Sequence, residues 1–187
     1  KPNGAIVLFG SEPFSSALRM SNIKNYKYDW TWKKNKPTGN FIAKMQPMRA
    51  LEQVSVFYKK QPTYNPQKIK RTPEEFKACY RKKDSVYNNG EQFVKGTKGI
   101  LIRKTEEEQW YKHPINLINF NLPDRRKSKQ HPTQKPILLM EYFIKTYTNE
   151  NETVLDFTMG SGSTGVAAKN LNRNFIGIEM DDNYFNI

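Results

Sequence analysis

The chain has 187 residues, of which 36% are hydrophobic, 13% aromatic and 26% charged, with a net charge of +13. This length suits one domain, or one domain with a sizeable insertion, and the aromatic content excludes a disordered chain. The single Cys79 excludes an internal disulfide, two histidines exclude a zinc-ligand pattern, and no apolar run approaches a membrane span. With no signal segment at its start, the sequence predicts a cytoplasmic protein without a structural metal.

The first sixty residues predict strands and one helix. Residues 5–9 form a continuous apolar run, typical of a strand covered on both faces. A helix should begin within residues 11–14, with Ser11 as its capping hydroxyl, and run to about Asn22. Residues 27–33 alternate aromatic and polar side chains, and residues 51–58 again favour a strand, with a loop at 34–47 between them.

The middle of the chain, from residue 59 to 129, predicts a separate irregular lobe. Five prolines interrupt polar stretches there, and only short pieces at 73–81 and 98–103 favour regular structure. Residues 59–130 hold 18 basic and 8 acidic side chains, whereas residues 131–187 hold 4 and 7. A basic insertion beside a slightly acidic region indicates binding of a polyanion, although a lysine-rich solvated surface would show the same charge.

Regular patterns resume near residue 131. Residues 136–147 predict a helix that begins with proline, 153–156 a strand, 163–170 a helix and 174–179 a second strand. A strand, a glycine-rich turn, a helix and a strand ending in an acid together predict a βαβ unit of nucleotide-binding type.

The glycine-rich turn carries the clearest chemical signal. Gly160 and Gly162 would let the backbone turn tightly and approach a ligand, which would meet the N–H groups of the following helix. Glu179 follows about 20 residues later, where its carboxylate could accept hydrogen bonds from two ribose hydroxyls. No Gly-Lys-Ser/Thr is present, which argues against a phosphate-binding P-loop. The same glycines could also form a purely structural turn.

A second motif, His-Pro-Thr-Gln-Lys-Pro at residues 131–136, immediately precedes the predicted helix at 136–147. In a purely structural interpretation, Thr133 would cap that helix and the prolines would set its entry angle.

Together these two motifs closely resemble the S-adenosylmethionine-binding half of the amino-group DNA methyltransferases, which modify adenine N6 or cytosine N4. Residues 131–136, 151–168 and 174–179 carry the resemblance, in the order of the beta subgroup. Residues 1–14, 30–35 and 52–59 resemble the stretch after the family's catalytic strand and its last two strands. Residues 61–127 fall where family members carry a variable recognition region.

The resemblance implies a three-layer α/β/α Rossmann-like sheet, mostly parallel with one antiparallel strand near the edge, and an inserted DNA-recognition lobe. The implied domains are 1–60 for the second half of the sheet, 61–127 for the recognition lobe and 128–187 for the cofactor-binding half. The implied cofactor-binding residues are Thr133, Gln134, Lys135, Asp156, Phe157, Gly160, Ser161, Gly162, Ser163, Thr164 and Glu179. Those expected on DNA phosphates are Arg81, Lys82, Lys83, Arg125, Arg126 and Lys127.

The implied reaction is methyl transfer to the amino nitrogen of a base that is flipped out of double-stranded DNA. Adenine N6 is favoured over cytosine N4 as the target. The family's catalytic tetrapeptide, Asp/Ser/Asn-Pro-Pro followed by an aromatic residue, is absent. We expect it upstream of Lys1, and expect these 187 residues alone to be inactive. The open alternatives are a catalytically inactive DNA-binding relative and a methyltransferase acting on RNA or protein. Bacterial or phage origin is expected, and a homodimer is left open.

Overall fold

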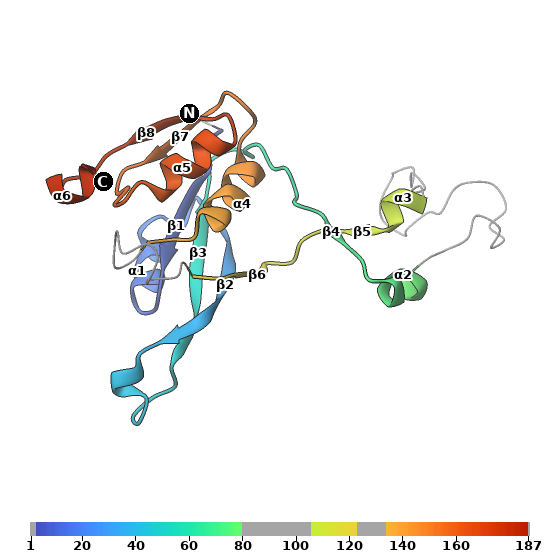
Figure 1. The fold of residues 1–187 in the computed structure, drawn as a ribbon, viewed down its shortest axis with the longest axis horizontal. Helices are drawn as coiled ribbons and strands as arrows, with labels where there is room; N and C mark the ends of the chain where they lie inside the picture. The colour runs from blue at the N-terminus through green and yellow to red at the C-terminus, as the bar shows by residue number, and fades with distance from the viewer. Residues whose placement is uncertain (1–2, 80–105, 123–133, 187) are drawn as a thin grey trace. The chain divides into compact units, whose positions relative to one another are not determined.

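The computed structural model of the chain describes residues 3–79, 106–122 and 134–186 (Figure 1). The chain divides into two compact units, one formed by Lys1–Pro66 with Ile115–Ile187 and the other by Gln67–Pro114. The strand β6 within Ile115–Ile187 belongs to the sheet of the larger unit. The irregular lobe predicted at 59–129 therefore includes residues that belong to the larger unit.

The larger unit contains a four-stranded sheet in the order β1-β3-β2-β6. Its strands are β1 (Ile6–Gly10), β2 (Tyr26–Thr38), β3 (Arg49–Phe57) and β6 (Leu117–Phe120). The strand β3 runs antiparallel to both of its neighbours, and β6 runs parallel to β2. The expected antiparallel strand near the edge is confirmed, because β3 is second from the β1 edge.

The two faces of this sheet differ in polarity because neighbouring side chains on a strand point to opposite faces. Trp30, Trp32, Val54 and Val56 are all buried on the face that packs against α4 (Ile137–Tyr147). The other face is polar and lies towards α1 (Phe14–Ser21), which contacts β1 and β3. This arrangement of helix, sheet and helix confirms the predicted three-layer α/β/α architecture.

The polar face is held by a partly buried carboxylate. Asp29 accepts hydrogen bonds from Arg19 of α1 at 2.9 Å, from the Tyr26 hydroxyl at 3.1 Å and from Ser55 at 2.6 Å. The expected capping by Ser11 is wrong: Pro13 is the residue before α1, and no side chain caps it. Instead, Glu12 accepts the backbone N–H of Ser16 at 3.1 Å.

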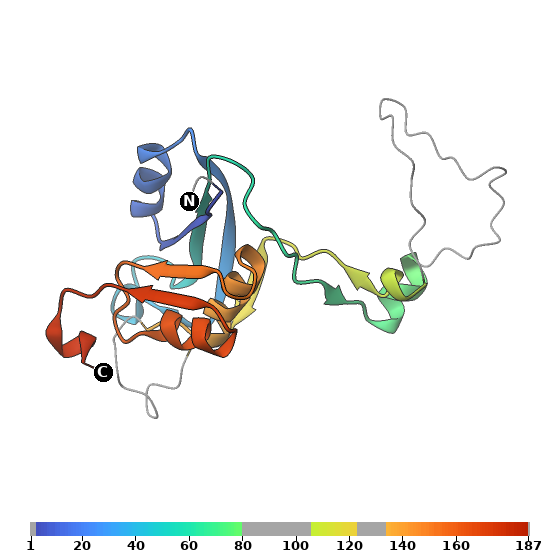
Figure 2. The ribbon, with the colours of Figure 1, turned by 90° about the horizontal axis from the view of Figure 1, so that it is seen from above.

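The predicted βαβ unit is confirmed by β7 (Thr153–Asp156), α5 (Ser163–Asn170) and β8 (Asn174–Gly177), followed by α6 (Asp182–Phe185). The strands β7 and β8 pair in parallel as a sheet of their own (Figure 2). Val154 and Phe175 pack towards α4 and α5, whereas Leu155 and Ile176 are more than half exposed on the other face.

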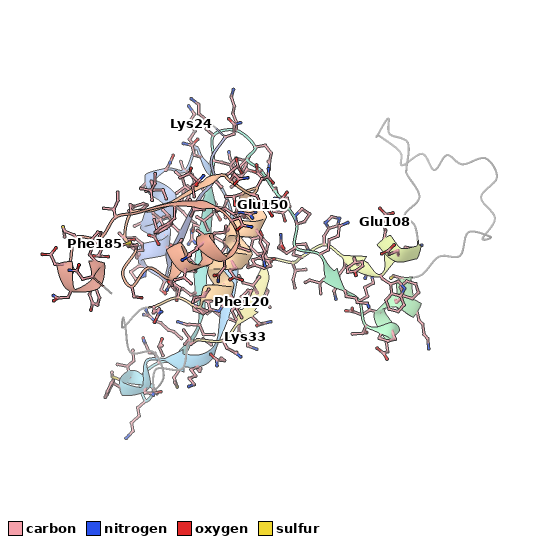
Figure 3. All side chains as sticks on the ribbon, turned by 45° about the horizontal axis from the view of Figure 1, so that its top comes forward. Lys24, Lys33, Glu108, Phe120, Glu150 and Phe185 are labelled. Atoms are coloured by element: carbon pink, nitrogen blue, oxygen red, sulfur yellow. The ribbon has the colours of Figure 1, made fainter. Side chains whose placement is uncertain are left out.

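The predicted loop at 34–47 is shorter than expected, because β2 continues to Thr38 and β3 begins at Arg49. The resulting β2–β3 hairpin projects beyond the rest of the sheet (Figure 1). Its tip contains η1 (Asn40–Ile42), in which Phe41 is fully exposed. Met45, also at the tip, is 80% exposed. Lys33, labelled in Figure 3, lies on β2 near the base of this hairpin.

The smaller unit has little regular structure in its described part. It contains β4 (Ile69–Lys70), α2 (Pro73–Cys79), α3 (Glu106–Gln109) and β5 (Tyr111–Lys112). Phe76 and Trp110 stack with their ring centroids 3.9 Å apart, and Lys70 lies 5.8 Å from the Trp110 ring. Lys112 pairs with Glu75. This stack forms a small core for the unit.

Candidate functional site

The glycine-rich loop between β7 and α5 has the backbone geometry that its glycines predict. Gly160 and Gly162 adopt left-handed φ angles of 54° and 73°, a region that favours glycine because it has no Cβ. A Cβ added at Gly162, the residue before α5, would meet no atom within 4 Å. The loop therefore turns tightly and leaves open space beside the first turn of the helix.

A different glycine is required for packing. A Cβ at Gly165 would lie 2.7 Å from the Phe175 ring, so this glycine lets α5 lie directly against β8. The loop consequently contains one glycine that keeps space open and another that allows close contact between helix and strand.

Asp156, at the carboxyl end of β7, organises the loop. One of its carboxylate oxygens accepts the Thr158 backbone N–H at 3.1 Å, and the other accepts the Thr164 hydroxyl at 2.6 Å. The Thr164 hydroxyl also lies 3.6 Å from the sulfur of Met140, in the first turns of α4. The carboxylate thus joins the end of the strand to the start of α5, and Thr164 joins both to α4.

Glu179 closes the loop from two residues beyond β8, which ends at Gly177 rather than at the predicted residue 179. Its Oε2 accepts the Gly160 backbone N–H at 2.8 Å, while its Oε1 accepts those of Met180 and Asp181 at 2.9 and 3.0 Å. Backbone hydrogen bonds, led by that of Asp181 and followed by that of Gly160, hold the pKa of the Glu179 carboxyl below its ordinary value. The predicted pairing of loop and acid is therefore a direct contact, with the carboxylate held in its charged form.

The described part of the second motif lies at the amino end of α4. Lys135 pairs with Glu52 of β3, and its ammonium lies 5.0 Å from the ring centroid of Phe9 and 5.6 Å from that of Trp32. The neighbouring Gln134 has a buried Oε1 for which the structure gives no hydrogen-bond partner. Its acceptor is therefore available for a donor that the described residues do not supply.

Two apolar side chains near the loop are exposed. Phe157, directly after β7, is 54% exposed, and Met180, directly after Glu179, is 97% exposed. Sequence reasoning named Phe157 but missed Met180, although its position next to the acid could have indicated it. It also missed Glu52, whose partner Lys135 lies 83 residues away. Of the other predicted residues, Ser163 is buried and Ser161 is half-buried at the loop.

The remaining predicted residues lie outside the described ranges, so the structure does not test them. They are Thr133, Arg81, Lys82, Lys83, Arg125, Arg126 and Lys127. Among the described residues, no three His, Cys, Asp or Glu side chains are grouped as a metal site. No helix in that part of the chain is long and apolar enough to cross a membrane.

A hollow of about 810 Å³ lies elsewhere in the larger unit, between α1 and the polar face of the sheet. Arg19 and Asp29, which line it, already pair with each other. We therefore place the candidate site at the loop, where two left-handed glycines, open space beside Gly162 and the Glu179 carboxylate occur together.

Comparison with known proteins identifies the family of this chain. The model of the N6/N4 DNA methylase family matches residues 1–187. This chain is a member of that family. The chain is 37% identical over 101 residues to the type II methyltransferase M2.LlaDCHI of Lactococcus lactis subsp. cremoris, covering 54% of this chain and 30% of that protein. It is 50% identical over 58 residues to M2.DpnII of Streptococcus pneumoniae, covering 31% of this chain and 22% of that protein.

Solved structures extend the likeness to the whole fold of the chain. It aligns with a crystal structure of M1.HpyAVI in complex with SAM at a TM-score of 0.62 and 30% identity, covering all of this chain and 72% of that one. The cytosine-N4-specific PvuII DNA methyltransferase aligns at a TM-score of 0.61 and 20% identity, covering 98% and 62% of the two chains, which supports the fold alone. The matched part of the chain spans less than a third of the length of each of these two curated relatives.

Proposed function

We propose that the protein containing this chain transfers a methyl group from S-adenosylmethionine to an exocyclic amino group of a base in double-stranded DNA. The observation that carries the proposal is the pairing of Glu179 with the backbone of the Gly160 turn, in a chain that belongs to the DNA methylase family. The relative M1.HpyAVI, 30% identical over this whole chain, has been solved as a SAM complex.

The residues of the loop fit such a cofactor. Glu179 presents a charged carboxylate suited to ribose hydroxyls, and the open space beside Gly162 lies at the start of α5, where N–H groups favour a carboxylate. S-adenosylmethionine supplies a methyl group that is already activated by the positive charge on its sulfur. The chain's own contribution is to bind and orient it, which can lower a barrier by several kcal/mol.

The proposed cofactor residues fall into five groups with different roles. Asp156 and Thr164 hold the loop in shape, Phe157 offers an apolar surface, and residues 160–163 approach the ligand with their backbone. Glu179 takes the ribose, and residues 133–135 lie towards the methionine end. Within this last group, Gln134 supports the assignment because its buried acceptor has no partner in the structure.

A surface on the β2–β3 hairpin supports DNA as the substrate. Residues 30–51 contain no acidic residue. The four exposed cations of the hairpin are Lys33, Lys36, Lys44 and Arg49. None of these four forms a salt bridge in the described part of the chain. Free cations on one projecting element suit phosphate contacts.

These cations add to the phosphate contacts proposed at residues 81–83 and 125–127. Replacing Lys36, Lys44 and Arg49 with Ala should flatten the slope of log affinity against log salt by about three units, if each meets one phosphate. The equivalent replacement of residues 81–83 provides the comparison. An unchanged slope in both variants would contradict phosphate binding at either place.

The decisive experiment is methyl transfer by the full-length protein. Tritiated methyl groups should be incorporated from S-adenosylmethionine into duplex DNA, and digestion of the product should identify the methylated base. We propose adenine N6 as the target, and recovery of N4-methylcytosine would instead establish the alternative. Binding of cofactor and DNA without incorporation would identify a catalytically inactive relative.

A further inference from the structure

Lys135 occupies a position that a helix terminus disfavours. It lies one residue before Pro136, the N-cap of α4, and the amino end of a helix repels a positive charge. No acidic residue occurs in the first turn of α4 to compensate. A cation at this place must therefore be stabilised by groups outside the helix.

The stabilising groups all belong to the sheet. The Lys135 ammonium pairs with Glu52 of β3 and lies over the rings of Phe9, on β1, and Trp32, on β2. The side chain of Glu52 is 12% exposed, and Trp32 is fully buried. Such a partly desolvated cation, held by a carboxylate and two aromatic rings, fixes the amino end of α4 to three strands.

The carboxylate of Glu52 also serves a second cation. Lys34, whose side chain is 8% exposed, lies 3.6 Å from Glu52 Oε2, so one carboxylate is shared between two lysines. The pair between Lys135 and Glu52 is therefore part of a network with one positive charge in excess. Its geometry depends on all three groups.

The other side of α4 contacts the loop of the candidate site. Met140 meets the Thr164 hydroxyl, Glu141 accepts a hydrogen bond from Asn170 at 2.9 Å, and Leu139 packs in the same core as two alanines of α5. The helix therefore has its amino end fixed to the sheet by Lys135 and its first turns fixed to α5.

We propose that Lys135 is a positioning residue of the cofactor site, which sets the place of α4 and through it the place of the loop and of Gln134. This inference rests on the function proposed above. A positioning role and a direct contact between the Lys135 ammonium and the cofactor predict different effects of removing Glu52. Loss of Glu52 would free the ammonium for a direct contact, but would release α4 if Lys135 acts by positioning.

The test uses four single variants of the full-length protein and the double variant that combines Lys135→Met with Glu52→Gln. Lys135→Met keeps the stem and removes the charge, Lys135→Arg keeps a charge able to pair with Glu52 and stack on rings, and Glu52→Gln removes the partner. Lys145→Met is the matched control, because Lys145 lies on the same helix and pairs only loosely with Glu141, at 4.0 Å. Affinity for S-adenosylmethionine is measured by calorimetry, and folding by circular dichroism.

We expect Lys135→Met and Glu52→Gln each to weaken cofactor affinity at least tenfold, and the double variant to be no weaker than either. Lys135→Arg should stay within about threefold of the wild type, and Lys145→Met should be unchanged. The KM for S-adenosylmethionine should rise in Lys135→Met, whereas the KM for DNA should not change.

Three results would overturn the inference. If the Lys135→Met protein were less stable but bound S-adenosylmethionine with wild-type affinity, Lys135 would have only a structural role. Unimpaired binding by Glu52→Gln would indicate a direct contact instead, as would failure of Lys135→Arg to restore binding. If the wild-type protein itself bound no S-adenosylmethionine, the proposed function would fall and the inference with it.

Discussion

Replacing Gly162 with alanine should have two effects that can be measured separately. One is backbone strain, which lowers stability, and the other is loss of space for the cofactor, which lowers affinity. The Gly162 φ of 73° is left-handed, where an alanine costs about 1–2 kcal/mol. The added Cβ would meet no atom within 4 Å, so strain should be the whole structural cost. Gly162→Ala should therefore lower the thermal midpoint by about 2–8 °C.

The effect on the cofactor should be much larger than this strain implies. If the open space beside Gly162 receives the cofactor, the new methyl group occupies it, and affinity for S-adenosylmethionine should fall at least tenfold. Calorimetric titration and thermal denaturation of the same protein samples measure the two effects separately.

Two other glycines provide controls. Gly39→Ala also forces alanine into a left-handed conformation, with a φ of 101°, but in the β2–β3 hairpin, and should leave affinity unchanged. Gly165→Ala should destabilise the fold more than Gly162→Ala, because its Cβ would lie 2.7 Å from the Phe175 ring. If Gly162→Ala bound the cofactor as tightly as the wild type, the space beside Gly162 would not be part of the site.

Three further predictions concern single side chains. Thr164→Val should lower cofactor affinity severalfold and stability by about 1.5–3 kcal/mol, because the hydrogen bond to the Asp156 carboxylate is lost. Thr164→Ser keeps the hydroxyl and should retain both the affinity, measured by calorimetry, and the stability, measured by urea unfolding. Tyr147→Phe should cost about 1–3 kcal/mol in urea unfolding, because Trp30 Nε1 and the Tyr28 hydroxyl, at 2.7 and 2.8 Å, both lose their buried partner; an unchanged midpoint would contradict this. Because the folded pKa of Glu179 is lowered, the stability from its contacts is present above the ordinary carboxyl pKa of 4.5 and is lost as pH falls through the lowered value. Carboxyl carbon NMR should give a midpoint below 4.5 for Glu179, and a midpoint at or above it would be inconsistent with the bonds to Gly160 and Asp181.

The βαβ unit was predictable because its signals are local. The glycines, the helix at 163–170 and the strand before it lie within one stretch of about twenty residues, and the observed α5 has the predicted bounds. Glu179 was predictable from spacing because a βαβ unit has a narrow range of lengths.

The remaining features depend on partners distant in the sequence. The four-residue strand β6 pairs with β2 more than eighty residues earlier, and prolines on either side of it favour a loop. The extension of β2 to Thr38, despite Pro37, requires the partner Arg49 across the hairpin. The contact of Lys135 with Glu52 spans 83 residues and leaves no periodic pattern.

The separation of the larger unit's strands into two sheets has a consequence for its motions. Among the described residues, no ladder of hydrogen bonds joins β7 and β8 to the other four strands, and Val154 and Phe175 instead pack against a core that includes side chains of α4 and α5. Side-chain packing couples the two sheets less strongly than backbone hydrogen bonds would. We therefore expect β7 and β8 to open together as a cooperative unit of their own. Its amides should then exchange with deuterium at a lower free energy than those of β2 and β3, and a bound cofactor should slow that exchange.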